Sequence, residues 1–254
     1  MQNSSQPTRT PLPTALPPLP GLDLFVRYHA IRTGGDFFDA VVVNSHLLFF
    51  LTDIAGDREH AQTIAAFAQD AFRLHAPHLF AVPDLNQMDT LAALAHEINL
   101  AIYHAASGSR LAPTFVGSFD LSLGLLAYIN AGGPSPIFRD SDGTRTLGHV
   151  TVPLGLFTHI TYEPAIQAFE SGSRLLLITK GILEARRDRT AFGEQRAVNL
   201  VETLTPGSAT ELTQTILDQA HNFRKLPWYS LQNLPFTKPD PPDDLTAVAL
   251  VRPQ

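Results

Sequence analysis

The sequence contains no cysteine, and this absence excludes several kinds of chemistry at once. Without thiols the chain can form no disulfide, no thiolate metal site and no cysteine nucleophile. It also lacks an apolar run long enough for a membrane span, and its N-terminus lacks the charged-then-apolar plan of a secretion signal. We therefore expect a cytoplasmic protein without a membrane span.

Positive charge is scarce as well. The 254 residues include 18 Lys and Arg against 24 Asp and Glu, which gives a net charge of −6. The basic residues are scattered along the chain, apart from a short cluster formed by Arg186, Arg187 and Arg189. This distribution argues against a nucleic-acid partner, because nucleic-acid-binding domains carry a basic face.

Proline divides the chain into a leader and a domain. The first twenty residues contain six prolines and little that could be buried, so we expect residues 1–20 to be an extended, disordered leader. The hydrophobic content of 44% is sufficient for a sizeable core in the rest of the chain. We therefore expect one domain over residues 21–254.

The apolar pattern after the leader predicts antiparallel sheets with helices packed outside them. Asp142-Gly143 is a tight-turn dipeptide that favours a hairpin, and Asp84 with Gln87 resembles a helix-capping pair. The predicted strands cover residues 22–31, 37–43, 47–52, 114–121, 125–130, 137–139, 160–169, 175–179 and 245–251. The predicted helices cover residues 64–72, 91–105 and 208–223, and a long proline-rich loop follows at 225–242.

One predicted hairpin brings two acidic side chains together. If Asn44-Ser45 is a two-residue turn, then Val43 pairs with His46, and Asp36 lies opposite Asp53. Directly opposed carboxylates destabilise a sheet unless a positive group lies between them. The alternative is that both aspartates lie in solvated loops, which the neighbouring glycines would permit.

Further charged residues lie at the ends of other predicted strands. Asp243 and Asp244 come directly before the last strand, and Lys180 ends the strand at 175–179. Because the start of one antiparallel strand lies beside the end of its neighbour, these positions and the Asp36–Asp53 pair can meet at one rim. Clustered aspartates without thiolates favour a hard cation, so the pattern predicts a site for Mg²⁺ or Mn²⁺.

Seven motifs in sequence order resemble one protein family. They are GGDFFD at 34–39, TDIAG at 52–56, NAGGPSP at 130–136, PLGLF at 153–157, LLLITKGILEAR at 175–186, FG at 192–193 and DDLTAV at 243–248. Together they resemble the SpoIIE/RsbU-type branch of the PPM (PP2C-like) metal-dependent serine/threonine protein phosphatases. The resemblance covers the chain from Leu19 to Arg252.

The resemblance implies an α+β fold, a four-layer αββα sandwich of two antiparallel sheets flanked by helices. It also implies a dinuclear Mn²⁺ or Mg²⁺ site in which a water held by the metals, and no side chain, attacks phosphorus. Asp53 would bridge the metals, Asp36 and the Ile54 carbonyl would hold the first metal, and Asp243 would bind the second. The supporting positions of these motifs are Gly35, Gly56, Gly181 and Asp244.

The sequence departs from the family at two positions. A fourth metal-binding aspartate belongs in the motif TDG, which here is Thr179-Lys180-Gly181, and the usual NAGH here ends in Gly133. One hypothesis is that Lys180 forms direct ion pairs with Asp53 and Asp243 in place of the second metal. The other is that Lys180 turns outward to solvent and leaves a merely impaired site. With the ligand replaced, we expect one metal or none here, against two in the family.

Two functions follow from these hypotheses. The first is a phosphatase, with reduced or lost activity, that dephosphorylates a small regulatory protein of the anti-sigma-factor-antagonist type in bacterial partner switching. The second is an inactive pseudophosphatase that binds such a protein as a regulatory module. The sequence leaves the substrate, the upstream signal and a homodimer open.

Overall fold

The computed structural model of the chain describes residues 9–16, 18–29, 35–148, 150–187, 190–204, 207–224 and 243–253. The loop expected at 225–242 lies outside these residues. Within the described residues, no helix is both long and apolar enough to cross a membrane.

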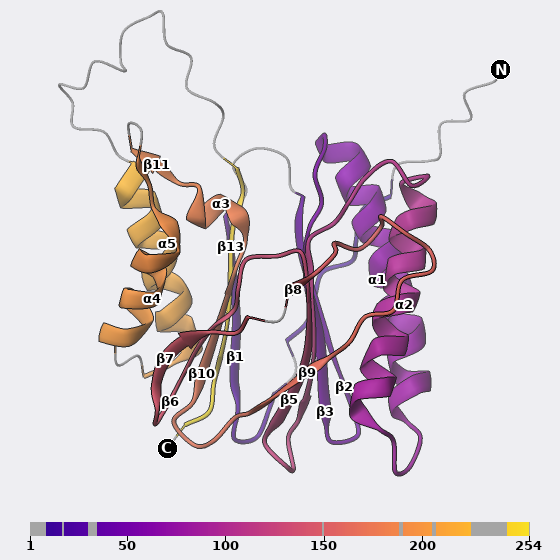
Figure 1. Ribbon diagram of the computed structural model, residues 1–254, viewed down its shortest axis with the longest axis horizontal. Coiled ribbons are helices and arrows are strands. Elements are labelled where there is room, and N and C mark those ends of the chain that lie inside the picture. Colours follow the sequence, from indigo (N-terminus) through magenta and orange to yellow (C-terminus); the bar gives the residue numbers. More distant parts are fainter. Residues whose placement is uncertain are drawn as a thin grey trace, which may run out of the picture.

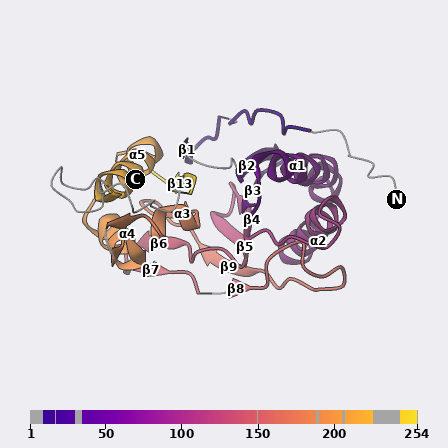
Figure 2. The same ribbon diagram turned by 90° about the horizontal axis from the view of Figure 1, so that it is seen from above.

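Two sheets stack face to face, and helices cover the outer face of each (Figure 1). In the view from above, α4 and α5 lie outside one sheet, and α1 and α2 lie outside the other (Figure 2). This arrangement is the expected four-layer αββα sandwich. The pairing is antiparallel, as predicted, except that β5 pairs with the two-residue strand β8 in parallel.

The strands of the two sheets come from interleaved parts of the chain. The first sheet has the order β1 (Asp23–His29), β13 (Leu245–Val251), β10 (Arg174–Ile178), β6 (Ile137–Asp140) and β7 (Gly143–Thr146). The second has the order β2 (Asp36–Val43), β3 (His46–Asp53), β4 (Thr114–Asp120), β5 (Leu125–Ala131) and β8 (Val150–Thr151), with β9 (Ala165–Ala168) also on β5. A separate hairpin pairs β11 (Arg186–Arg187) with β12 (Thr190–Ala191).

The continuous apolar runs are explained by burial on both faces of each sheet. Along β3, Leu47, Phe49 and Leu51 pack between the two sheets. Leu48 and Phe50 point the other way, into the core under the helices. Since alternate side chains enter two different cores, neither face of such a strand needs polar residues, and the sequence shows no alternation.

The helices are α1 (Arg58–Phe80), α2 (Gln87–Ala105), α3 (Lys180–Leu183), α4 (Gly193–Thr203) and α5 (Ala209–Arg224). Ser208 caps α5, because its Oγ accepts a hydrogen bond from the Glu211 amide at 3.1 Å. The predicted cap of α2 is wrong: Asn86 caps that helix through the amides of Met88 and Asp89. Helix α4 was not predicted.

The hairpin predicted at Asp142-Gly143 joins β6 to β7. Asp140 accepts two hydrogen bonds from the Arg145 guanidinium, at 2.9 and 2.7 Å, and one from the Asp142 amide. The bonds from Arg145 lower the pKa of Asp140, although partial burial opposes them.

We expect Asp140→Asn to lower the free energy of unfolding by about 1 kcal/mol at pH 7. Because the pKa of Asp140 is lower in the folded state, this stabilisation is fully present above about pH 4 and is lost as the pH falls through the folded-state pKa. Urea unfolding of both proteins from pH 7 to pH 3 measures it. A difference between the proteins that is constant down to pH 3 would contradict this assignment.

The described part of the N-terminal leader lies along β2 and α1 (Figure 2). The Gln69 side chain bonds both the amide and the carbonyl of Leu12, at 2.7 and 2.9 Å. The Thr14 hydroxyl donates to the Phe38 carbonyl and is also 2.8 Å from a carboxylate oxygen of Asp39. Arg9 also contacts α1, through hydrogen bonds with Thr63 and an ion pair with Asp70, so the segment is attached to the sandwich from Arg9 onward.

Candidate functional site

Acidic side chains converge at the end of the sandwich where β2 begins and β3 ends. The β2–β3 register pairs Val43 with His46 and Asp36 with Asp53, which confirms the predicted hairpin. The start of β13 joins this pair, because Asp244 accepts a hydrogen bond from the Gly35 amide at 3.2 Å.

Asp36 links the two sheets. Its Oδ2 accepts hydrogen bonds from the Thr179 hydroxyl at 2.8 Å and from the Thr246 hydroxyl at 2.6 Å, both of which follow or lie on strands of the other sheet. Burial raises the pKa of Asp36 well above its usual range, and the charge of Asp53 raises it further, against the opposing effect of the hydroxyl groups. The two threonines therefore stabilise a carboxylate that lacks a positive partner among the described residues.

Charged groups of both signs act on the Asp53 carboxylate. Burial raises its pKa to about 6, and the carboxylate of Asp243 contributes to the increase. Lys180 acts in the opposite direction and lowers the pKa. The structure thus brings Asp243 and Lys180 within electrostatic reach of Asp53, as the topology predicted.

Lys180 makes its ion pair one helical turn away. Its Nζ lies 3.3 Å from Oε1 of Glu184, and its side chain is 63% exposed. Lys180 and Asp53 both lie in the described part of the chain, and they do not form the direct ion pair that one hypothesis expected. The outward orientation proposed as the alternative is the one observed, and Glu184 is a partner that the sequence did not suggest. A long side chain on the first residue of a helix meets a residue four positions on more easily than it reaches inward.

Two glycines permit the close backbone approaches of the site. A Cβ atom on Gly35 would collide with the Ile54 carbonyl oxygen, and a Cβ atom on Gly181 would collide with the Asp244 carbonyl oxygen. Gly56 has a φ of +143°, and the Arg110 guanidinium lies against it. The lack of a side chain at Gly35 and Gly181 therefore lets their backbones lie directly against the Ile54 and Asp244 carbonyl groups.

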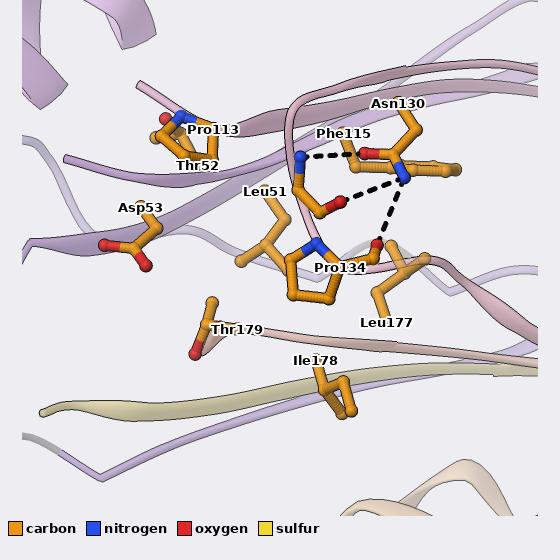
Figure 3. Close-up of a pocket in the computed structure, with 11 residues that line it drawn as sticks. Leu51, Thr52, Asp53, Pro113, Phe115, Asn130, Pro134, Leu177, Ile178 and Thr179 are labelled. Atoms are coloured by element: carbon orange, nitrogen blue, oxygen red, sulfur yellow. Dashed lines mark hydrogen bonds between the residues drawn. The ribbon is translucent and has the colours of Figure 1, made fainter. Parts of the chain in front are cut away.

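A small cavity lies between the two sheets beside Asp53 (Figure 3). Asn130 holds one wall in place: its side chain bonds the amide and carbonyl of Gly133 and the carbonyl of Pro134. The Asp53 carboxylate and the Thr179 hydroxyl lie at the opposite side of the view. The volume of about 20 Å³ admits a water molecule but no side chain of a partner.

The described residues do not form a two-metal centre. Among them, no group of three or more histidine, aspartate or glutamate side chains is arranged to hold a metal ion. Both hydroxyl donors to Asp36 bond the same oxygen, Oδ2, and the Ile54 carbonyl oxygen lies close to Gly35. The position of the fourth aspartate carries an ammonium group instead. The donor set is therefore one carboxylate short of the family's two-metal centre.

Two residues of the site were missed in the sequence. Thr179 and Thr246 lie inside the motifs that were recognised, directly before Lys180 and two residues after Asp244. A hydroxyl at the end of a buried strand, beside an acidic motif, is the signal that could have identified them.

Comparison with known proteins supports one fold. The family described as "Stage II sporulation protein E (SpoIIE)" matches residues 44–253. "Phosphoserine phosphatase RsbP" of Bacillus subtilis is 32% identical over 66 residues, which are 26% of this chain and 16% of that protein.

Solved structures with low identity share the architecture. The RsbU and RsbW domains of Rv1364c from Mycobacterium tuberculosis superpose with a TM-score of 0.70 at 19% identity, over 92% of this chain and 62% of that one. The SiaA-PP2C domain of Pseudomonas aeruginosa gives 0.69 at 16% identity, over 89% and 84%. The chain therefore spans less than two thirds of the RsbP and mycobacterial relatives.

Proposed function

The chain belongs to the SpoIIE family of PP2C-like phosphatase domains, and from that membership we propose that it binds a phosphorylated regulatory protein without hydrolysing it by the two-metal route. The observation that carries this proposal is the Lys180–Glu184 ion pair at the position where the family has a metal-binding aspartate. The replacement removes a carboxylate ligand and adds a positive charge near Asp53. Both changes oppose the binding of a second divalent cation.

The names of the relatives support the kind of partner. RsbP is called a phosphoserine phosphatase, and the mycobacterial chain combines an RsbU domain with an RsbW domain. We infer a phosphorylated protein of the anti-sigma-factor-antagonist type in a partner-switching pathway of the cytoplasm. The sandwich is retained although one of the family's metal-binding aspartates is replaced, which supports a function in binding.

A weak hydrolase with one metal is the second candidate, and the raised pKa values of Asp36 and Asp53 favour it. Burial is the largest cause of both raised pKa values, and a bound cation would favour the charged form of the two carboxylates. Asp36, Asp53 and the Ile54 carbonyl would hold one Mn²⁺ or Mg²⁺. When bound, that ion would stabilise negative charge on a phosphoryl group.

The test uses the natural protein and a library of nine-residue peptides with a fixed central phosphoserine. We expect phosphorylation-dependent binding in fluorescence anisotropy and no phosphate release above the no-enzyme background in the presence of Mn²⁺. Calorimetry with Mn²⁺ separates the two candidates, because the one-metal hydrolase requires saturable binding of one ion. Rapid, manganese-dependent release of phosphate would overturn the binding-only function.

A further inference from the structure

Four arginines surround the C-terminal end of α5, in a chain that is otherwise acidic. We propose that this arginine face, formed by Arg186, Arg187, Arg196 and Arg224, binds the phosphoryl group of the partner protein. The inference rests on the proposed function and names the residues that would recognise the phosphate. Its occupant is a phosphorylated serine or threonine side chain in an exposed segment of the partner.

An aromatic ring organises the arginine face. The guanidinium carbons of Arg187 and Arg196 both lie 4.9 Å from the centroid of the Phe223 ring. Phe192 packs edge-on against Phe223 at a centroid distance of 5.7 Å, which fixes the ring between the hairpin and α5. Cation–π contacts therefore place both guanidinium groups against one aromatic ring.

The individual arginines differ in how their donors are used. Arg196 donates to the carbonyls of Ala191 and Phe192, so packing of the hairpin accounts for it. Arg186 and Arg187 are exposed on β11, where they extend from a two-residue strand. Because consecutive side chains of a strand point to opposite faces, only Arg187 packs over Phe223 of α5, where its guanidinium group can give a phosphate charge-assisted hydrogen bonds.

Arg224 supplies the strongest indication of a ligand. Its Nη2 donates to the Gly181 carbonyl at 3.0 Å, which orients the guanidinium. Its Nη1 is buried and has no hydrogen-bond partner among the described residues. A buried charged donor without an acceptor is costly, and an anion at this position would satisfy it.

The arginine face lies at the same end of the sandwich as the acidic site. Gly181 connects the two, because its Cα abuts the Asp244 carbonyl and its carbonyl accepts from Arg224. In Figure 1, β11, α3 and the start of β13 lie together at this end. Of the acidic groups there, Glu184 pairs with Lys180, and Asp243 acts electrostatically on both Arg224 and Asp53. A phosphorylated segment that crossed this end would therefore meet the arginines beside the former metal site.

The experiment measures binding of the fluorescein-labelled phosphoserine library and of its unphosphorylated counterpart. The test variants are Arg187→Ala, Arg224→Gln and the double variant. Arg9→Ala is the matched control, because it removes an exposed arginine whose ion pair with Asp70 lies on α1, outside the other sheet. We expect the double variant to weaken binding of the phosphorylated library by at least about tenfold, which corresponds to about 1.4 kcal/mol. Arg9→Ala should change it less than about twofold.

Arg224→Lys separates recognition from folding. It keeps the positive charge but loses the planar guanidinium group, which can donate two parallel hydrogen bonds to a phosphate. We expect it to retain the thermal stability of the natural protein and to bind the phosphorylated library more weakly. Equal binding of both libraries by the natural protein, or equal binding by the natural protein and the double variant, would overturn the inference. If the natural protein instead hydrolyses the library rapidly, the binding-only function fails. The arginine face is then tested by KM, which the double variant must raise.

Discussion

Lys180→Asp is expected to give the protein manganese-dependent phosphatase activity. The substitution replaces the ammonium group near Asp53 with a carboxylate at the family's fourth metal-binding position. Asp53, Asp243 and the new aspartate would then provide three carboxylates for a second cation. Because metal ions contribute several kcal/mol to phosphoryl transfer, we expect phosphate release from the phosphoserine library to rise by about 100-fold or more above that of the natural protein.

Two companion variants identify the cause of such a gain. Lys180→Ala removes the positive charge without adding a ligand, so it should raise Mn²⁺ affinity slightly and leave turnover at background. Glu184→Gln breaks the ion pair of Lys180 but keeps the ammonium group, and it should remain inactive. Calorimetry should show tighter Mn²⁺ binding by Lys180→Asp than by either companion.

The same measurements can contradict the assignment of position 180. If Lys180→Asp folds and binds Mn²⁺ tightly but releases no phosphate, the lost histidine position at Gly133 becomes the more important departure from the family. If the natural protein already releases phosphate as fast as the variant, Lys180 does not block the site.

The fold was largely predictable because its strongest signals are local. The Asn44-Ser45 turn fixed the register of β2 and β3, and every pair in that ladder followed from it. Continuous apolar runs identified β10 and β13, which are buried on both faces. Helix α4 was not predicted, since it has only 11 residues and only Ala197 and Val201 are buried along it.

The site was predictable in its position but not in its side-chain contacts. Topology alone brings Asp36, Asp53 and Asp243 to one end of the sandwich. The orientation of Lys180 depends on a competition between a distant carboxylate and Glu184 on the same short helix, and spacing in the sequence does not determine which is closer. The hydroxyl donors to Asp36 likewise come from the opposite sheet, across more than a hundred residues of chain.

Arg73→Ala is expected to cause the largest loss of stability among these substitutions. Asp39 is completely buried, and it accepts hydrogen bonds from Arg73 Nε at 2.7 Å and Nη2 at 3.0 Å. The Gln69 amide and the Thr14 hydroxyl complete its environment, so three segments of the chain meet at this carboxylate. Removal of the guanidinium leaves a buried charge without its cation, which costs about 3–5 kcal/mol.

Urea unfolding should show this loss directly, and the melting temperature should fall by roughly 10 °C for a chain of this size. Arg9→Ala is again the matched control, because the Arg9–Asp70 ion pair is about half exposed and surface pairs of this kind contribute no more than about 1 kcal/mol. Cleavage of the N-terminal segment gives a second measurement of the lost ion pair, because Arg73 also donates a hydrogen bond to the Pro13 carbonyl. Limited proteolysis should therefore cleave residues 9–16 faster in Arg73→Ala than in Arg9→Ala. Equal stability of the two variants would show that the Arg73–Asp39 ion pair is not what joins the leader, β2 and α1.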